Sequence, residues 1–243
     1  MIGCRIHQLD EVDSTQSVLS ELARDGAPEG TVVTARHQTG GRGRRGRRWW
    51  DEPGQSLLMS VLLRPRVPPS RVPQLSLLGG LAMTDALLAA AGVTARIRWP
   101  NDVLVGQRKV CGILSEASSG RDGQVEHVIV GIGLNIDQAR FPDELLPVAS
   151  SLRLATGRSH DHARVLECVL AALDRRYAEW LGGGFAGLRT VWREHSLTIG
   201  ARVPLPGGGD GVAVDVDADG ALLVDAGDGA LRRLVSAEPA AAR

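Results

Sequence analysis

The hydrophobic residues of the chain alternate between short runs that are typical of β-strands and longer stretches with helical spacing. Apolar positions at helical spacing predict one helix behind Ser14 and Thr15, which are typical N-cap residues, and another from 74 to 91 that Gly92 ends. Runs rich in apolar or β-branched residues predict strands at 5–12, 31–37, 56–64, 95–99, 103–105, 109–117 and 125–136. The run at 56–64 is apolar at most positions, so we expect that strand to be covered on both faces.

The pattern changes after about residue 160. A helix is predicted from Asp161 or His162 to about Trp180, and the run Gly182–Gly184 should separate it from a shorter helix that ends near His195. His160 and His162 have no third partner at metal-binding spacing. We therefore expect these two histidines to serve as cap and solvent-facing residues.

From residue 197 onward the segments are shorter and glycine-rich turns separate them. This even spacing of turn signals predicts a small β-barrel, with strands at 202–205, 212–216, 222–224 and 232–235. We expect an α/β (α+β) protein with a main domain at 1–196 and a small β domain at 197–243.

Composition narrows the class of protein. The chain has 28 basic and 28 acidic residues and 43% hydrophobic residues, which argues against bulk electrostatic attraction to DNA or to a membrane. No apolar run is expected to approach the length of a membrane span, and the N-terminus does not look like a signal peptide. Cys4, Cys111 and Cys168 are far apart and form no C-x-x-C pair. They suggest a reducing compartment, so we expect a cytoplasmic protein.

One stretch, 36–50, concentrates positive charge on a flexible backbone. It holds six arginines and four glycines and no acid. Glycines let backbone N–H groups approach an anion, and guanidinium groups bind carboxylate or phosphate through paired hydrogen bonds. The stretch is therefore predicted to close over a small polyanion. A solvated basic loop and a nucleic-acid patch with tryptophans for stacking remain the alternatives.

Two phosphate-binding motifs fail in this stretch. Gly41, Gly43 and Gly46 match G-x-G-x-x-G, but the residues that follow would stop the helix that a dinucleotide fingerprint requires. Gly41 and Gly46 also have phosphate-loop spacing, but Arg47 and Arg48 stand where lysine and serine or threonine are needed.

Three further features indicate a ligand site. Lys109 is the only lysine among the 28 basic residues, which suggests a place where a compact ammonium is required. Ser14 and Thr15 would present hydroxyls at a helix N-terminus, where polar ligand atoms bind well. Gly131 and Gly133 lie within a predicted strand and imply close approach of another group.

These features occur within a series of motifs that resembles the biotin protein ligases. The motifs are DST at 13–15, HQT at 37–39, GGRGRRGRRW at 40–49, WPND at 99–102, RKVCGILSE at 108–116 and GIGLNI at 131–136. The resemblance covers nearly the whole chain. It implies a mixed-sheet catalytic domain of the biotin/lipoate ligase type, followed by a small barrel of the SH3 type. Because the chain begins directly at the catalytic region, we expect the enzyme-only class, which lacks an N-terminal DNA-binding domain.

The resemblance also implies a reaction. The biotin carboxylate would attack the α-phosphate of ATP, with Mg²⁺ present, to give biotinyl-5′-AMP and pyrophosphate. The lysine amine of a biotin carboxyl carrier domain would then attack the mixed anhydride. The expected partners are biotin, ATP and that carrier domain, without nucleic acid or membrane. The protein is expected to be a monomer or weak homodimer.

The roles of individual residues follow from the same resemblance. The catalytic candidates are Lys109, Arg44 and Asp102. Biotin binding is assigned to Ser14, Thr15, Gln16, Gln38, Gly41, Arg42, Gly43, Arg44, Lys109 and Gly112. ATP binding is assigned to Arg44, Arg45, Arg47, Arg48, Trp49, Asn101 and Asn135. The metal site is not assigned beyond an Mg²⁺ held through phosphates near Asn135.

Three positions differ from or are not explained by the family pattern, and two alternative functions remain. Gln16 stands where asparagine is frequent, Arg98 stands where lysine is common, and Cys111 lies beside Gly112 and is expected to be a small buried residue. One rival function is a lipoate–protein or octanoate–protein ligase with a related fold. The other is a non-catalytic nucleic-acid-binding protein that uses the arginine-rich stretch.

Overall fold

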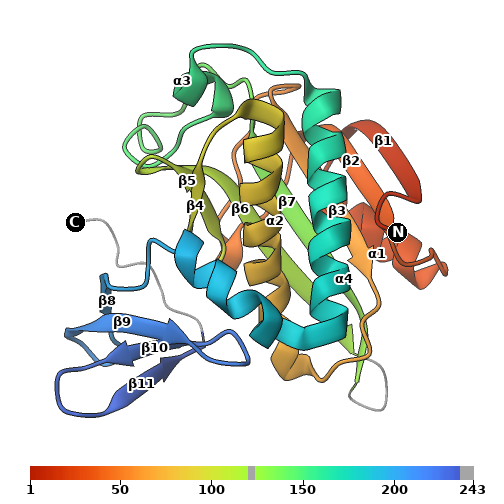
Figure 1. Cartoon of the computed structure of the whole chain (residues 1–243). Coiled ribbons are helices and arrows are strands. Elements are labelled where there is room, and N and C mark those ends of the chain that lie inside the picture. Colours follow the sequence, from red (N-terminus) through yellow and green to blue (C-terminus); the bar gives the residue numbers. More distant parts are fainter. Residues whose placement is uncertain (120–123, 236–243) are drawn as a thin grey trace.

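The computed structural model describes residues 1–119 and 124–235 and contains one large sheet and one small sheet (Figure 1). The large sheet has seven strands in the order β1-β2-β3-β7-β6-β5-β4. Only β1 and β2 pair in parallel, and the other neighbours are antiparallel, so the mixed α/β class is confirmed. The strands are β1 (Arg5–Val12), β2 (Thr31–Gln38), β3 (Ser56–Leu63), β4 (Ala95–Arg98), β5 (Asp102–Val105), β6 (Arg108–Ser119) and β7 (Val125–Asn135).

One face of the sheet is covered by the short helix α1 (Thr15–Arg24). Ser14 caps it as predicted, because its side chain accepts a hydrogen bond from the backbone N–H of Gln16. Leu19 and Ala23 of α1 pack against Val33 of β2 and other apolar side chains of β3 and β7. The helix therefore covers only part of this face and leaves the ends of β6 and β7 open.

The other face is covered by α2 (Pro73–Ala91) and α4 (His162–His195), which lie side by side in Figure 1. With helices on both faces, every residue of β3 is buried, as the apolar run predicted. Gly92 ends α2 in the left-handed conformation with φ of 70°. The segment Pro69–Ala91 is long and apolar enough to cross a membrane, so the expectation that no run approaches that length is wrong. It passes that test as a core helix, since 67% of the apolar window is buried inside the protein.

Helix α4 contains the two predicted helical segments joined at Gly184. This glycine has φ of 62° and ψ of −168°, which are not helical, and the helix changes direction there. Asp161 caps the N-terminus through hydrogen bonds from the backbone N–H groups of Ala163 and Arg164. The glycine run therefore acts as a bend inside one element.

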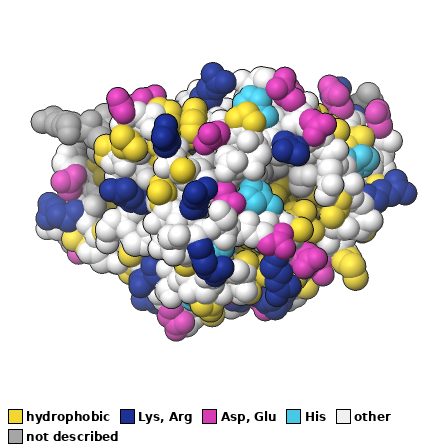
Figure 2. Space-filling view, turned by 90° about the horizontal axis from the view of Figure 1, so that it is seen from above, with side chains coloured by type: hydrophobic (Ala, Val, Ile, Leu, Met, Phe, Trp, Pro, Cys, Tyr) yellow, Lys and Arg dark blue, Asp and Glu magenta, His cyan; other side chains and the backbone are white. Residues whose placement is uncertain are grey.

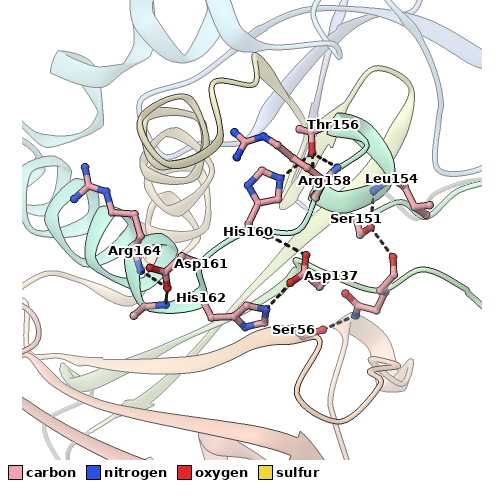
Figure 3. Close-up of polar contacts among 12 residues, drawn as sticks. Ser56, Asp137, Ser151, Leu154, Thr156, Arg158, His160, Asp161, His162 and Arg164 are labelled. Atoms are coloured by element: carbon pink, nitrogen blue, oxygen red, sulfur yellow. Dashed lines mark hydrogen bonds and ion pairs between the residues drawn. The ribbon is translucent and has the colours of Figure 1, made fainter.

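A polar network joins the loop after β7 to the start of α4 and to the short helix α3 (Leu152–Thr156) (Figure 3). His160 is 8% exposed, and its Nε2 lies 2.8 Å from the Thr156 hydroxyl. Its backbone N–H donates to Asp137, whose other carboxylate oxygen lies 3.4 Å from Nε2 of His162. The expectation that these histidines face solvent is wrong for His160, because it is buried where the loop after β7 and helix α3 meet. Burial, with Arg158 nearby, lowers the pKa of His160.

The small sheet is antiparallel, in the order β11-β10-β9-β8, and lies next to the second segment of α4 (Figure 1). The short strands predicted in this part of the chain do form a small β-sheet. Closure of this sheet into an SH3-type barrel stays a prediction. The 3₁₀ turns η1 (Arg44–Gly46) and η2 (Pro69–Arg71) lie outside both sheets. The strands of the small sheet are β8 (Arg202–Pro204), β9 (Asp210–Val216), β10 (Leu222–Asp225) and β11 (Leu231–Leu234).

The hairpin between β9 and β10 depends on Asp217. Its carboxylate accepts hydrogen bonds at 2.9 Å from the backbone N–H groups of Asp219 and Ala221 and pairs with Arg233. We expect Asp217→Ala to lower the free energy of unfolding by about 1–2 kcal/mol, because two backbone donors lose their acceptor. Denaturant unfolding measures this loss, and Asp210→Ala, at an exposed acid of the same sheet, is the control.

The loss of unfolding free energy in Asp217→Ala should depend on pH, and the direction follows from the pKa of Asp217. Burial of Asp217 raises its pKa, but hydrogen bonds from Arg233 and from the hairpin backbone outweigh burial, so the pKa is lowered overall. A lowered carboxyl pKa stabilises the fold above the unfolded value near about 3.9, and the stabilisation is lost as pH falls through the folded value. The difference between wild type and Asp217→Ala should stay constant from about pH 6 to 8 and shrink below about pH 4. A difference that grows on acidification would contradict this account.

Candidate active site

A cavity of about 600 Å³ lies on the same face of the large sheet as α1. Its floor is formed by β6 and β7, one end by the N-terminus of α1, and its cover by the arginine-rich loop. Gly112 and Gly133 are paired across the two strands of the floor, and Leu114 is paired with Gly131. The sequence motifs, which are far apart in the chain, therefore meet around a single cavity.

The end of the cavity at α1 is lined by interlocked polar groups. The Gln38 amide oxygen accepts from the backbone N–H of Thr15 at 2.8 Å and from its hydroxyl at 3.1 Å. The Thr15 hydroxyl also lies 2.8 Å from that of Ser60, and Ser14 is 2% exposed. These contacts fix the side chains in place before a ligand binds. The contribution of Ser60 was not predicted, because a serine within an apolar strand gives no signal of its own.

Gln16 closes this end of the cavity from the side. Its amide donates to the carbonyl of Leu114 at 3.3 Å and its side chain lies on Gly131. A Cβ at position 131 would come within 2.8 Å of Cδ of Gln16. Gly131 is therefore required by a side chain of α1, and Gln16 lines the cavity although it departs from the family pattern.

The indole of Trp49 lies flat against the floor. A Cβ at Gly133 would be 2.5 Å from Cε2 of Trp49, and one at Gly112 would be 2.9 Å from Cζ3. The ammonium of Lys109 is 5.5 Å from the centre of the same ring, within the range of a cation–π contact. Gly112 makes room for Trp49 and Lys109, and its close approach to a ligand stays a prediction.

Lys109 is held by residues at the end of β4 and the start of β5. Its ammonium lies 2.6 Å from one carboxylate oxygen of Asp102, and Arg98 donates to the other oxygen at 2.9 Å. Burial opposes ionisation of Asp102, but the charge of Lys109 and hydrogen bonds from Lys109 and Arg98 outweigh it and lower the pKa of Asp102. The carboxylate therefore stays ionised near neutral pH. Arg98, whose role was left open, lines the cavity.

The arginine-rich loop is a narrow hairpin over the cavity. The backbone N–H of Gly43 donates to the Arg47 carbonyl at 2.6 Å, and that of Trp49 donates to the Gly41 carbonyl at 2.9 Å. At its base, Nδ1 of His37 lies 2.8 Å from the buried carboxylate of Asp51. These contacts hold the two arms of the hairpin together, so the side chains at the tip of the hairpin would move together.

The predicted arginines divide into two groups. Arg42, Arg44, Arg47 and Arg48 line the cavity, whereas Arg45 does not. Gly41, which was also predicted to bind biotin, does not line it either. Arg42 pairs with Glu116 at 3.0 Å. Burial, and then repulsion by Arg45, lower the pKa of Arg44, against the opposing charge of Asp102. Cys111 is fully buried outside the cavity, and burial raises the pKa of its thiol well above the usual value.

Both predicted asparagines line the cavity, but their amides are already bonded to the protein. Asn101 donates to the Ile113 carbonyl at 2.8 Å. Asn135 donates to the Ser150 carbonyl at 2.9 Å and accepts from Gln138 at 3.0 Å. Within residues 1–119 and 124–235, no group of three or more His, Cys, Asp or Glu side chains is arranged to hold a metal ion. The residues described there do not form a protein cage for Mg²⁺.

An apolar lobe of the cavity beside Lys109 was not predicted from the sequence. Trp50 contacts Phe141 with ring centroids 5.7 Å apart, and Leu145 and Val148 complete the lobe. The backbone of Val148 accepts from that of Lys109 at 2.8 Å, which joins the lobe to the lysine. Residues 137–149 have no periodic pattern, so nothing in the sequence indicated that they fold over the site.

Hydroxyls and amides, a lysine–aspartate pair and a group of arginines thus surround one cavity. The chain also matches known protein families. Residues 9–135 match the biotin/lipoate A/B protein ligase family, and residues 198–238 match the biotin protein ligase C-terminal domain. The chain belongs to the biotin/lipoate A/B protein ligase family. The resemblance seen in the motifs is therefore confirmed.

Individual relatives cover nearly the whole chain. It is 38% identical over 243 residues to the bifunctional ligase/repressor BirA of Bacillus spizizenii, covering 98% of this chain and 74% of the relative. It is 38% identical to the biotin–[acetyl-CoA-carboxylase] ligase of Mycobacterium tuberculosis, covering 93% and 86%. The Aquifex aeolicus biotin protein ligase solved with biotin and ATP superposes with a TM-score of 0.83 at 31% identity, covering 97% of each chain.

The charged side chains on one face of the molecule do not form a region of a single sign. Seen from above in Figure 2, basic and acidic side chains are interspersed with apolar ones. An extended basic surface is the electrostatic footprint expected of a nucleic-acid-binding protein. The positive charge of the arginine-rich loop is instead directed at the cavity, which disfavours the nucleic-acid alternative.

Proposed function

We propose that the protein is a biotin ligase that activates biotin to biotinyl-5′-AMP with ATP and transfers the biotinyl group to a lysine of a biotin carboxyl carrier domain. The observation that carries this proposal is the single cavity in which Thr15 and Gln38 lie at one end, Lys109 in the middle and an apolar lobe at the other. An acid with a polar head, its carboxylate and a nucleotide base would occupy these three regions in turn.

The first step joins two anions, so its barrier depends on charge. The carboxylate oxygen of biotin attacks the α-phosphorus, a new P–O bond forms, and the bond to the pyrophosphate oxygen breaks. Arg44 and the ammonium of Lys109 would neutralise the developing charge on the carboxylate and α-phosphate. Mg²⁺, which would arrive with ATP and be held by its phosphates, supplies further charge neutralisation. No group of this chain is assigned to hold it.

In the second step a lysine amine of the carrier attacks the acyl carbon of the adenylate and AMP leaves. The amine must lose a proton as the amide forms. Asp102 is ionised and lies within 2.6 Å of Lys109, so it is the carboxylate placed to accept a hydrogen bond from an incoming amine. An Asp102→Asn variant with normal transfer from preformed adenylate would remove this assignment.

Two observations support biotin over lipoate or octanoate. The C-terminal segment matches the C-terminal domain of biotin protein ligases, and the arginine-rich loop is present in full. The head end of the cavity is also lined by the hydroxyls of Ser14 and Thr15 and the amides of Gln16 and Gln38, which suit a ureido group better than a hydrocarbon tail. The three cysteines are free in the structure, which supports the cytoplasm as the proposed location.

The test is biotin-dependent release of pyrophosphate from ATP and Mg²⁺, compared with lipoate and octanoate, with a carrier domain added to capture the acyl group. Release with biotin and a matching mass increase at the carrier lysine supports the proposal. Activation of lipoate without biotin would keep the fold and change the substrate. No activation of any acid would overturn the proposal.

The apolar lobe is proposed to hold the adenine base. We expect Phe141→Leu to raise the KM for ATP about fivefold, because a base–aromatic contact contributes about 1–3 kcal/mol and Trp50 remains. The KM for biotin should change less than about twofold. Steady-state pyrophosphate release measures both constants, and Leu88→Ser, at an exposed apolar position of α2, is the control. An equal rise in both KM values would contradict a base-specific role.

A further inference from the structure

The turn at 98–102, which includes the last residue of β4 and the first residue of β5, carries three side chains that line the cavity. They are Arg98, Asn101 and Asp102, of which Asp102 contacts Lys109 directly. The position of this turn therefore sets the distance between Asp102 and Lys109. Its front faces the cavity, and its back faces the small C-terminal sheet.

The back of the turn is bonded to the C-terminal unit through Trp99. The backbone N–H of Trp99 donates to the Thr198 hydroxyl at 2.8 Å, and its indole N–H donates to the carbonyl of Gly220 at 3.0 Å. Trp99 is 7% exposed, and both hydrogen bonds are buried. Just before it, Ile97 accepts from the backbone N–H of Leu197 at 2.7 Å. The C-terminal unit thus holds the turn on the side away from the cavity.

The hairpin that accepts the Trp99 bond is itself fixed against α2. The Ala218 carbonyl accepts from the Gln74 amide at 2.7 Å, and the Gln74 amide oxygen accepts from the Trp180 indole at 2.7 Å. Gly220 has φ of 85°, and a Cβ there would be 2.8 Å from Cδ1 of Leu77. These contacts fix the position of the hairpin relative to α2. The hydrogen bond from Trp99 to Gly220 then fixes the position of the turn relative to the hairpin.

We infer that the C-terminal sheet takes part in the reaction by positioning the 98–102 turn through the Trp99–Gly220 hydrogen bond. Trp99 is a positioning residue, because it belongs to the turn that carries Asp102 and does not line the cavity. If the hairpin shifts, the buried indole N–H of Trp99 loses its acceptor, and the turn must move to find another. Asp102 would then leave Lys109. This inference rests on the proposed function for its rate effects, but not for its structural effect.

The test compares Trp99→Phe and Thr198→Val with Trp192→Phe. Phenylalanine keeps a ring at position 99 and removes the indole donor, while valine keeps the shape of Thr198 and removes the acceptor. Trp192 is fully buried, and its indole N–H has no partner among the residues that the structure describes. Trp192→Phe therefore removes the same atoms without breaking a hydrogen bond. The melting temperature of each variant reports its loss of stability.

We expect kcat for biotin-dependent pyrophosphate release to fall about tenfold in Trp99→Phe and about threefold in Thr198→Val, because each variant loses a hydrogen bond that aligns the turn. The KM values for biotin and ATP should change less than about twofold, and Trp192→Phe should keep kcat even at a similar melting temperature. An unchanged kcat in both test variants, or an equal fall in Trp192→Phe, would overturn the inference.

Hydrogen exchange of the 98–105 peptide, measured without ligands, separates this inference from the proposed function. Exchange should be faster in Trp99→Phe and Thr198→Val and unchanged in Trp192→Phe. If the wild type releases no pyrophosphate with biotin, the proposed function fails and the exchange result alone decides. Unchanged exchange in both test variants would then overturn the inference.

Discussion

Lys109→Arg is expected to lose most of the ligase activity, by about 10²–10³-fold in the rate of pyrophosphate release. The positive charge is retained, so the loss would come from shape. The Lys109 ammonium fits between an Asp102 oxygen at 2.6 Å and the Trp49 ring at 5.5 Å, with Gly112 directly beneath. A planar guanidinium is larger and cannot occupy that space while directing a donor at the same point.

The measurement is single-turnover formation of the adenylate at saturating biotin and ATP. Arg108→Lys is the matched control, because Arg108 is the exposed neighbour of Lys109 on the same strand and exchanges the same two side chains in reverse. It should keep the wild-type rate. Full activity in Lys109→Arg would mean that only charge is required at this position, and the assignment of a compact ammonium would be wrong.

Gly133→Ala is expected to lower the rate of adenylate formation about 100-fold while the protein remains folded. The new Cβ would lie 2.5 Å from the Trp49 indole, which is too close for any real contact. Trp49 belongs to the arginine-rich loop, so the loop can move away without disturbing the core. The rate of adenylate formation would fall, because the arginines of the loop would move away from the cavity together with Trp49.

Activity and melting temperature together test this expectation. The melting temperature should fall by less than about 4 °C, equivalent to about 1 kcal/mol for a chain of this size. Gly187→Ala is the control, because it is exposed in α4 and an added methyl group would meet nothing within 4 Å. It should leave activity unchanged and stabilise the helix by about 0.5–1 kcal/mol. An active Gly133→Ala enzyme would show that Trp49 need not lie on the floor.

Much of the fold was predictable from local patterns. The N-cap at Ser14, the fully buried strand β3 and the left-handed stop at Gly92 each depend on residues that are neighbours in the chain. The order of strands in the large sheet was not predicted from periodicity, because periodicity is the same whichever strands pair. Its mixed character came from the resemblance of the motifs to a family.

The candidate site divides in the same way. The glycine-rich arginine loop and the lone lysine stand out in the sequence because residue type and spacing alone distinguish them. His160 was expected to face solvent, but the loop after β7 encloses it, and no local pattern reports such a loop. The apolar lobe around Phe141 was missed for the same reason.

The sequence by itself determined which chemical groups the protein offers: guanidinium groups on a flexible backbone, one ammonium, and hydroxyls at the start of a helix. Only the tertiary structure decided which of them meet. Trp49 lies on Gly112 and Gly133, and Trp99 reaches Gly220, through contacts between residues far apart in the chain. Such contacts depend on the packing of whole elements against one another, and the free energy of that packing is not a property of any local segment.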